Sequence, residues 1–241
     1  MNKKVSSMLL AGALLLGTVA PIVANADGTT GTTKSSISFA KPDPSTKPVD
    51  PDKPGEIVPG DGGGTTASGE LTFLYVSKSM DFGKNLAIQT TANAKEYHPT
   101  VETQAMGDVP ENTKLIAEVA DTRGTNAGWT VQVSADKMTT EANGAGDVLT
   151  GATLDLDGST ATINNSAVTD YKDAGISGVN AELSTDGTSK TLFSAKEGSG
   201  VLNTTFQLDP SNITLANIPA NVKAGTYSGN VNWTLSDTPG A

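Results

Sequence analysis

The chain has 241 residues, no cysteine, a single histidine and a formal net charge of −10. The missing cysteines exclude disulfides and thiol chemistry, and the acidic balance argues against nucleic-acid binding, which needs clustered Lys and Arg. The length is sufficient for a sizeable core in one or two domains.

Residues 1–26 are predicted to be a secretory signal peptide. Two lysines precede an apolar run, Met8–Leu16, and Ala24-Asn25-Ala26 forms a small-x-small cleavage site. The run is interrupted at Gly17 and is shorter than the about 20 residues that span a bilayer. We therefore expect a secreted protein that begins at Asp27 and has no transmembrane span. Cleavage removes two lysines and no acid, so the mature net charge is −12.

Residues 27–69 are predicted to hold one short strand and then a spacer. Ser35–Ala40 alternates polar and apolar side chains, and six of the twelve prolines lie between Pro42 and Pro59. A stretch so rich in Pro, Asp and Gly buries little apolar area to offset its ordering entropy, so we expect extended or mobile chain. A proline-rich recognition peptide is the alternative, but its usual apolar and basic side chains are sparse here.

Residues 70–241 are predicted to form one β-rich domain. The first strand is expected to be buried on both sides, with Leu71, Phe73 and Tyr75 sharing one face. Further alternating segments are Leu115–Val119, Trp129–Ser134, Leu154–Leu156 and Tyr227–Leu235, and Asp157-Gly158 is typical of a hairpin turn.

No segment of ten or more residues after the signal peptide shows a 3.6-residue apolar period. Thr, Ser, Asn, Asp and Gly recur every few residues, which is typical of many short strands joined by turns. The pattern predicts an all-β fold, an antiparallel β-sandwich of the Ig-like, Greek-key type with long loops. The polar stretches 135–153 and 164–190 are expected to be hairpins or surface loops.

Two tripeptides stand out, Trp129-Thr130-Val131 and Trp233-Thr234-Leu235. The second ends the segment AGTYSGNVNWTL, and the domain opens with LTFLYVS followed by MDFG. This set of segments resembles the WxL domain family of cell-surface proteins, from about Ser35 to Ser236. Val131 departs from the usual Leu of the first motif, and the change keeps an apolar strand residue.

The resemblance implies a protein held non-covalently on the peptidoglycan of a Gram-positive cell wall, at the extracellular surface. It also implies possible protein partners, either WxL-interacting surface proteins or host matrix proteins. Two hypotheses follow: direct binding of peptidoglycan, and a protein–protein or adhesion module that takes a partner through an edge strand or an apolar patch.

The role of the two motif tryptophans is left open between ligand contact and core packing. An exposed indole can stack on the apolar face of a sugar or anchor a protein interface. Trp129 and Trp233 each share a strand face with aliphatic residues, however, and such faces usually turn inward. Core packing is therefore favoured for at least one of them.

No catalytic residue, metal site or cofactor is predicted, and the chain is not expected to be an enzyme. His98 has no second His or Cys with which to form a zinc or nucleophilic site. Asp155 and Asp157 resemble a fragment of a calcium loop, but the remaining ligands are missing and a solvated turn is preferred. The many other acids show no spacing that singles out a pair for glycoside cleavage.

Overall fold

The computed structural model describes residues 32–86, 96–102, 112–140 and 146–240. The predicted signal peptide and the predicted first mature residue, Asp27, lie outside the described residues. The chain divides into two units, residues 1–39 and residues 40–241. Within the described ranges, no helix has the length and apolar character needed to cross a membrane.

The regular secondary structure of the second unit is almost entirely β-strand, which confirms the all-β prediction. The strands are β1 (Leu71–Val76), β2 (Met80–Asp81), β3 (Thr100–Val101), β4 (Leu115–Asp121), β5 (Trp129–Ala135), β6 (Thr139–Thr140), β7 (Asp147–Val148), β8 (Thr153–Asp157), β9 (Thr162–Asn165), β10 (Ile176–Gly178), β11 (Asn180–Ser184), β12 (Lys190–Ala195), β13 (Leu202–Leu208), β14 (Ile213–Ala216) and β15 (Val231–Ser236). Two short 3₁₀ turns, Gly158–Thr160 and Pro210–Asn212, complete the regular structure of the described residues.

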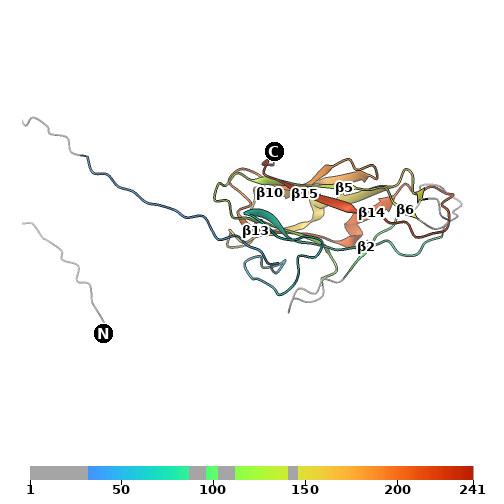
Figure 1. Ribbon diagram of the computed structural model, residues 1–241, viewed down its shortest axis with the longest axis horizontal. Helices are drawn as coiled ribbons and strands as arrows, with labels where there is room; N and C mark the ends of the chain where they lie inside the picture. Colours follow the sequence, from blue (N-terminus) through green and yellow to red (C-terminus); the bar gives the residue numbers. More distant parts are fainter. Residues whose placement is uncertain (1–31, 87–95, 103–111, 141–145, 241) are drawn as a thin grey trace, which may run out of the picture. The chain divides into compact units, whose positions relative to one another are not determined.

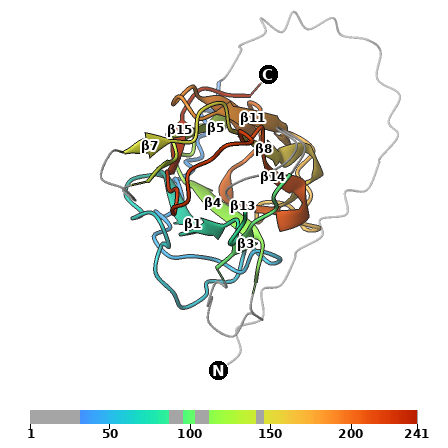
Figure 2. The same ribbon diagram turned by 90° about the vertical axis from the view of Figure 1, so that its right-hand side faces the viewer.

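Three antiparallel sheets form a sandwich. One sheet has the order β1-β4-β13-β9, the second β10-β12-β5-β15 and the third β11-β8-β14. Figures 1 and 2 show β13 and β4 in one layer and β5 and β15 in the other. Two small pairs, β2–β3 and β6–β7, stand beside the main sheets.

The main core contains buried residues of all three sheets, including Leu156 of β8 and Leu183 of β11. Phe206 of β13 stacks on Phe193 of β12 with ring centroids 4.6 Å apart, and Phe193 meets Trp129 of β5 edge to face at 5.5 Å. All three side chains are fully buried. The alternation predicted for β8 is confirmed, because its two leucines are its buried residues. In β5 the alternation holds from Trp129 to Val133, but Ser134, predicted for the polar face, is buried as well. Large buried rings are the main apolar contribution to such a core.

The face predicted for Tyr75 is wrong. A bulge shifts the register of β1 against β4 between Phe73 and Tyr75. Phe73 packs against the main core, whereas Tyr75 joins Ile116 and Val58 in a second cluster. The extra residue of a bulge breaks the period of two, and the alternation in the sequence gave no sign of it.

The hairpin predicted at Asp157-Gly158 is also wrong. The 3₁₀ turn there connects β8 to β9, which belong to different sheets. A Cβ on Gly158 would lie 2.5 Å from the carbonyl oxygen of Val179, so a glycine is needed for this close backbone approach. The Asp-Gly pair therefore marks a crossing between sheets.

Part of the predicted spacer packs as a strap on the outer face of the β4–β13 sheet. We call residues 48–58 the strap; Val49 and Val58 are buried, and Val49 pairs with Ile57 in a β-bridge. The Pro51 carbonyl accepts hydrogen bonds from the side chains of three sheet residues, Asn164, Thr205 and Gln207. This segment differs from the expected mobile chain because polar side chains of the sheet satisfy its backbone.

The short strand expected at Ser35–Ala40 is not formed. Residues 32–46 carry no strand or bridge, and Ile37 and Phe39 are 78% and 87% exposed. A strand needs a neighbour to satisfy its backbone groups, and these residues form no β-bridge. The compact unit accordingly begins at Ala40, well before residue 70.

Candidate functional site

The two motif strands lie side by side. β5 and β15 pair antiparallel, with Leu235 opposite Val131 and Ser236 opposite Thr130. The pairing joins residues about one hundred positions apart in sequence. It brings the last residues of the two tripeptides together, while Trp233 lies opposite Val133 and not opposite Trp129.

Trp129 is a core residue. Its side chain is fully buried, and its indole Nε1 donates a hydrogen bond of 2.9 Å to the carbonyl oxygen of Gly200. Gly200 has φ +75°, and a Cβ there would lie 2.6 Å from the same Nε1. The buried N–H is therefore satisfied by a backbone that only glycine brings close enough.

Trp233 has a different environment. It is half-buried on the inner face of the edge strand β15 and meets Phe73 of β1 edge to face, with ring centroids 6.5 Å apart. Phe73 and Trp233 thus connect the outermost strands of the two layers. The sequence favoured core packing for at least one tryptophan, and the structure places Trp129 in the core and Trp233 at its margin.

The threonines of both motifs lie on the opposite, polar side of the β5–β15 pair. Thr234 is exposed, and the Thr130 hydroxyl donates to the carbonyl oxygen of Thr238 at 2.8 Å. Next to them the side-chain amides of Asn230 and Asn232 both donate to the Asp136 carboxylate. This face therefore presents hydroxyl and amide groups with few charges.

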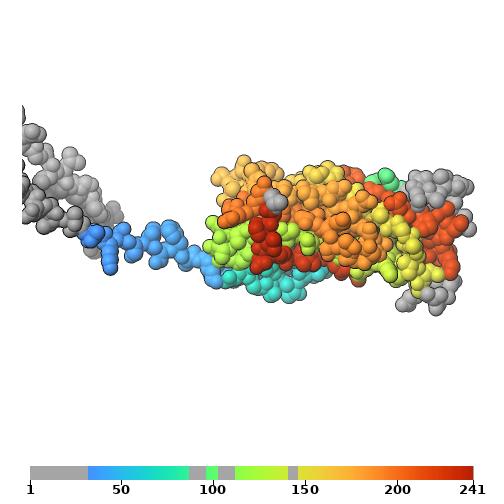
Figure 3. Space-filling view, turned by 90° about the horizontal axis from the view of Figure 1, so that it is seen from above, coloured from blue at the N-terminus to red at the C-terminus, as the bar shows by residue number. Residues whose placement is uncertain are grey.

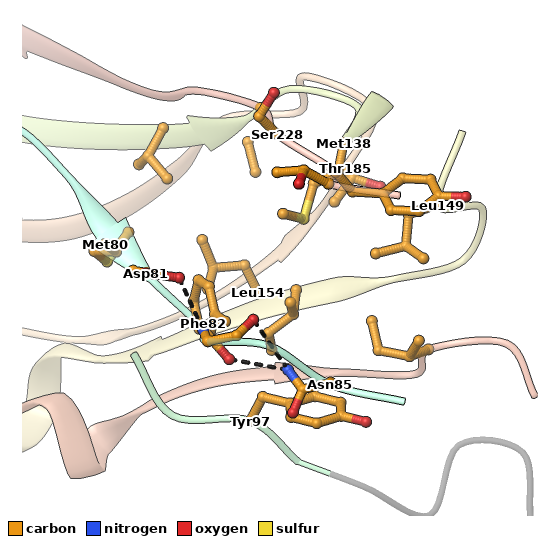
Figure 4. Close-up of a pocket in the computed structure, with 18 of the residues that line it drawn as sticks. Met80, Asp81, Phe82, Asn85, Tyr97, Met138, Leu149, Leu154, Thr185 and Ser228 are labelled. Carbon is orange, nitrogen blue, oxygen red and sulfur yellow. Dashed lines mark hydrogen bonds between the residues drawn. The ribbon is translucent and has the colours of Figure 1, made fainter. Parts of the chain in front are cut away.

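A cavity of about 1080 Å³ opens where β15 begins. Its apolar lining comes from separate parts of the chain: Phe82, Tyr97, Met138, Leu149, Tyr227 and Trp233. Figure 4 shows the side chains of Phe82, Leu154 and Tyr97 reaching it from different segments. Volumes of this size are typical of clefts that bind small molecules or short polymers.

Polar groups lie along the rim of this cavity and hold its loops. The Asp81 carboxylate accepts from the backbone N–H of Gly83 at 2.8 Å, and the Asn85 amide donates to the Phe82 carbonyl at 3.0 Å. Lys223 pairs with Asp147 at 2.8 Å, and this hydrogen-bonded ion pair raises the pKa of Lys223. The rim thus carries both signs of charge around an apolar interior.

Sequence reasoning missed most of the cavity. Met138 and Leu149 fall in the stretch 135–153 that was expected to be hairpins or surface loops. The sequence pattern predicted Tyr227 to lie in the last strand, on its apolar face. In the structure Tyr227 precedes that strand and packs with Leu149 and Met138. The tyrosine inside the segment AGTYSGN was the one available signal, because it is a large aromatic residue between turn-forming residues.

The residues considered for catalysis or metal binding do not form a constellation. The His98 ring Nδ1 lies 2.8 Å from the carbonyl oxygen of Ile213, so that nitrogen carries the proton. Burial and the nearby charges of Glu182 and Asp157 raise the pKa of Asp155. Across the described part of the chain, no group of three or more His, Cys, Asp or Glu is arranged to hold a metal ion.

The fold defines an all-β module with two paired motif strands. The family model for the WxL domain, described as a surface cell-wall-binding domain, matches residues 26–239. The chain belongs to this family of cell-surface wall-binding proteins. Neither the comparison with curated proteins nor that with solved structures gave a match.

Proposed function

We propose that this protein is secreted and binds Gram-positive peptidoglycan directly and non-covalently through its WxL domain. The cavity beside Trp233 is the observation that carries the proposal. Its aromatic and aliphatic lining suits the apolar faces of a glycan, and the hydroxyl and amide groups of the neighbouring β5–β15 face suit its polar edges. The predicted signal peptide, residues 1–26, supports export.

Charge contributes little to this mode of binding. The mature chain is strongly acidic, and so it gains no general attraction to an anionic polymer. The contacts available in the cavity are mainly apolar, and interactions of that kind are not screened by salt. Binding is therefore expected to persist at high ionic strength.

The proposal is tested by sedimentation of the purified chain, residues 27–241, with peptidoglycan sacculi that have been freed of protein and teichoic acid. We expect sedimentation at both low and high salt. Protein that stays in the supernatant at both salt concentrations contradicts direct wall binding.

A variant pair assigns the binding to the cavity. Tyr227→Ala removes a partly buried ring from its lining, and Val179→Ala removes an exposed apolar side chain that is not part of it. We expect binding about 2- to 12-fold weaker for Tyr227→Ala, because an aromatic contact is worth about 0.5–1.5 kcal/mol. Equal binding by both variants would place the contact elsewhere.

A second candidate function is a protein–protein or adhesion module. The observation that favours it is the edge position of β15, whose only strand neighbour among the described residues is β5. An exposed edge can take an extended segment of a WxL-interacting surface protein or a host matrix protein. Retention on intact walls together with loss on protein-free sacculi would favour this function.

A further inference from the structure

The sandwich is open along one side. β1 and β15 are the outermost strands of their sheets, and the Phe73–Trp233 ring contact shows that these two edges face each other. Among the described strands, β1 has only β4 as a neighbour and β15 only β5. Figure 3 shows the red C-terminal segment on the surface of the molecule.

Half-buried apolar side chains follow this open side. We call it the seam and define it by Leu71 and Phe73 of β1 together with Leu235 of β15. All three pack against the core and remain partly exposed. None of them lines the cavity of the proposed wall-binding site. An apolar strip next to an unpaired strand edge favours the addition of another strand.

The same chain carries an apolar segment without a β-partner. In Ser35–Ala40, which we call the arm, Ile37 and Phe39 are separated by one residue and so project to the same side of an extended strand. They are 78% and 87% exposed, among the most exposed large apolar side chains of the described chain. The arm thus has the alternating pattern of a half-buried strand but forms no strand or bridge in the structure.

We propose that the arm of one copy of this chain adds as a strand to the free edge of β15 in a second copy. Ile37 and Phe39 then cover the seam. Main-chain hydrogen bonds to the strand edge supply affinity, and the two apolar side chains supply the register. The arm and the seam are different surfaces, so the contact is heterologous, and repeated addition joins copies head to tail.

Charge also favours this occupant. Residues 32–41 contain Lys34 and Lys41 and no acid, whereas residues 42–241 contain 12 Lys and Arg against 25 Asp and Glu, a net charge of −13. A cationic segment is attracted to such a domain. Because each molecule has one arm and one seam, each copy can give its arm to one neighbour and receive the arm of another. The seam residues Leu71, Phe73 and Leu235 do not line the cavity, although Val231 and Trp233 of the same strand β15 do. The tests below therefore use no wall material, so that assembly is measured independently of wall binding.

The first test is the mass of the chain, residues 27–241, by light scattering or sedimentation over a wide concentration range without any wall material. We expect the mass to rise with concentration. The double variant Ile37→Asp/Phe39→Asp should remain monomeric, and the control Val179→Asp, at another exposed apolar position, should assemble as the unsubstituted chain does. A monomer at all concentrations, or equal assembly by the arm variant, overturns the proposal.

A peptide spanning residues 33–41 gives an independent readout. It should bind the arm variant with one-to-one stoichiometry and shorten assemblies of the unsubstituted chain, and the same peptide with both Asp substitutions should bind at least tenfold more weakly. If the unsubstituted chain is monomeric and only the arm variant binds the peptide, the arm binds the seam of its own molecule. That result overturns the head-to-tail assembly.

Cross-linking locates the contact. The chain has no native cysteine, so single cysteines can be introduced without a background. Oxidation of a mixture of Phe39→Cys and Leu235→Cys copies should give a disulfide-linked dimer. A mixture of Phe39→Cys with Val179→Cys copies should give much less. Equal yields from the two mixtures would contradict a contact at the seam.

Discussion

Trp129 and Trp233 each begin a copy of the same motif, but the two side chains lie in different environments. Trp129 is enclosed by the core and bonded to Gly200, while Trp233 lies half-buried between two edge strands. The motif therefore reflects the strand pair β5–β15 more than a shared ligand contact. The alternation of apolar residues favoured core packing for at least one of the two rings, but it could not say which ring is more buried, because burial depends on which strand lies at the sheet edge.

The different burial predicts different costs for removal of the two rings. Trp129→Ala should lower the free energy of unfolding by about 3–5 kcal/mol, the usual cost of removing a fully buried large aromatic ring. Trp233→Ala should cost about 1–2 kcal/mol, because only part of its area is buried. Urea denaturation of the two variants measures both values. An equal loss would contradict the difference in environment.

Glu118 predicts a pH dependence of stability. Its side chain is fully buried and accepts a hydrogen bond from the Val49 N–H at 3.0 Å, and burial raises its pKa to about 8. The folded chain therefore holds a proton that the unfolded chain, with an ordinary Glu pKa, loses above about pH 4.5. Stability should fall as the pH rises from about 4.5 to about 8 and then level off, with each pKa unit worth about 1.4 kcal/mol.

The matched variant for this effect is Glu118→Gln, which stays neutral and keeps an oxygen to accept the bond from Val49. Its melting temperature should change less between pH 5 and pH 8 than that of the unsubstituted chain. The same slope in both proteins would assign the pH dependence to other groups.

At the scale of elements, the sequence predicted the strands that carry their own apolar alternation. It failed for segments whose structure depends on contacts with residues far away in the sequence. The strands β5, β8 and β15 follow from alternation that each contains within itself. The strap does not, because its hydrogen-bond partners Asn164, Thr205 and Gln207 lie more than one hundred residues away. Composition alone makes that segment look like a free spacer.

The strap is expected to stabilise the domain on which it packs. Val49→Asp places a charge at a fully buried position and should cost about 3 kcal/mol or more. Ile57→Asp is the matched control, because Ile57 is the bridge partner of Val49 but is 64% exposed. Limited proteolysis should cut the strap faster in the first variant only. Equal cutting in both would show that the strap contributes little.

At the scale of the molecule, the fold class was accessible from sequence and the cavity was not. Many short alternating segments predict antiparallel sheets. The cavity, in contrast, is lined by residues spread from Ser77 to Trp233, including Met138 and Leu149 from a stretch without a clear pattern. Such a site depends on the order of strands in the sheets, which alternation leaves undetermined.

Contacts between distant parts of the chain, including those of the strap, can form only late in folding. The Pro51 carbonyl of the strap accepts from Thr205, 154 residues later, and β5 finds its edge partner only when β15 is present. If the chain is exported from its N-terminus, as proposed above, the strap emerges early, long before β13 is present to receive it. Nearly the whole polypeptide must emerge before these contacts close, so we expect slow folding, on a millisecond-to-second scale or longer, with strap docking as a late step.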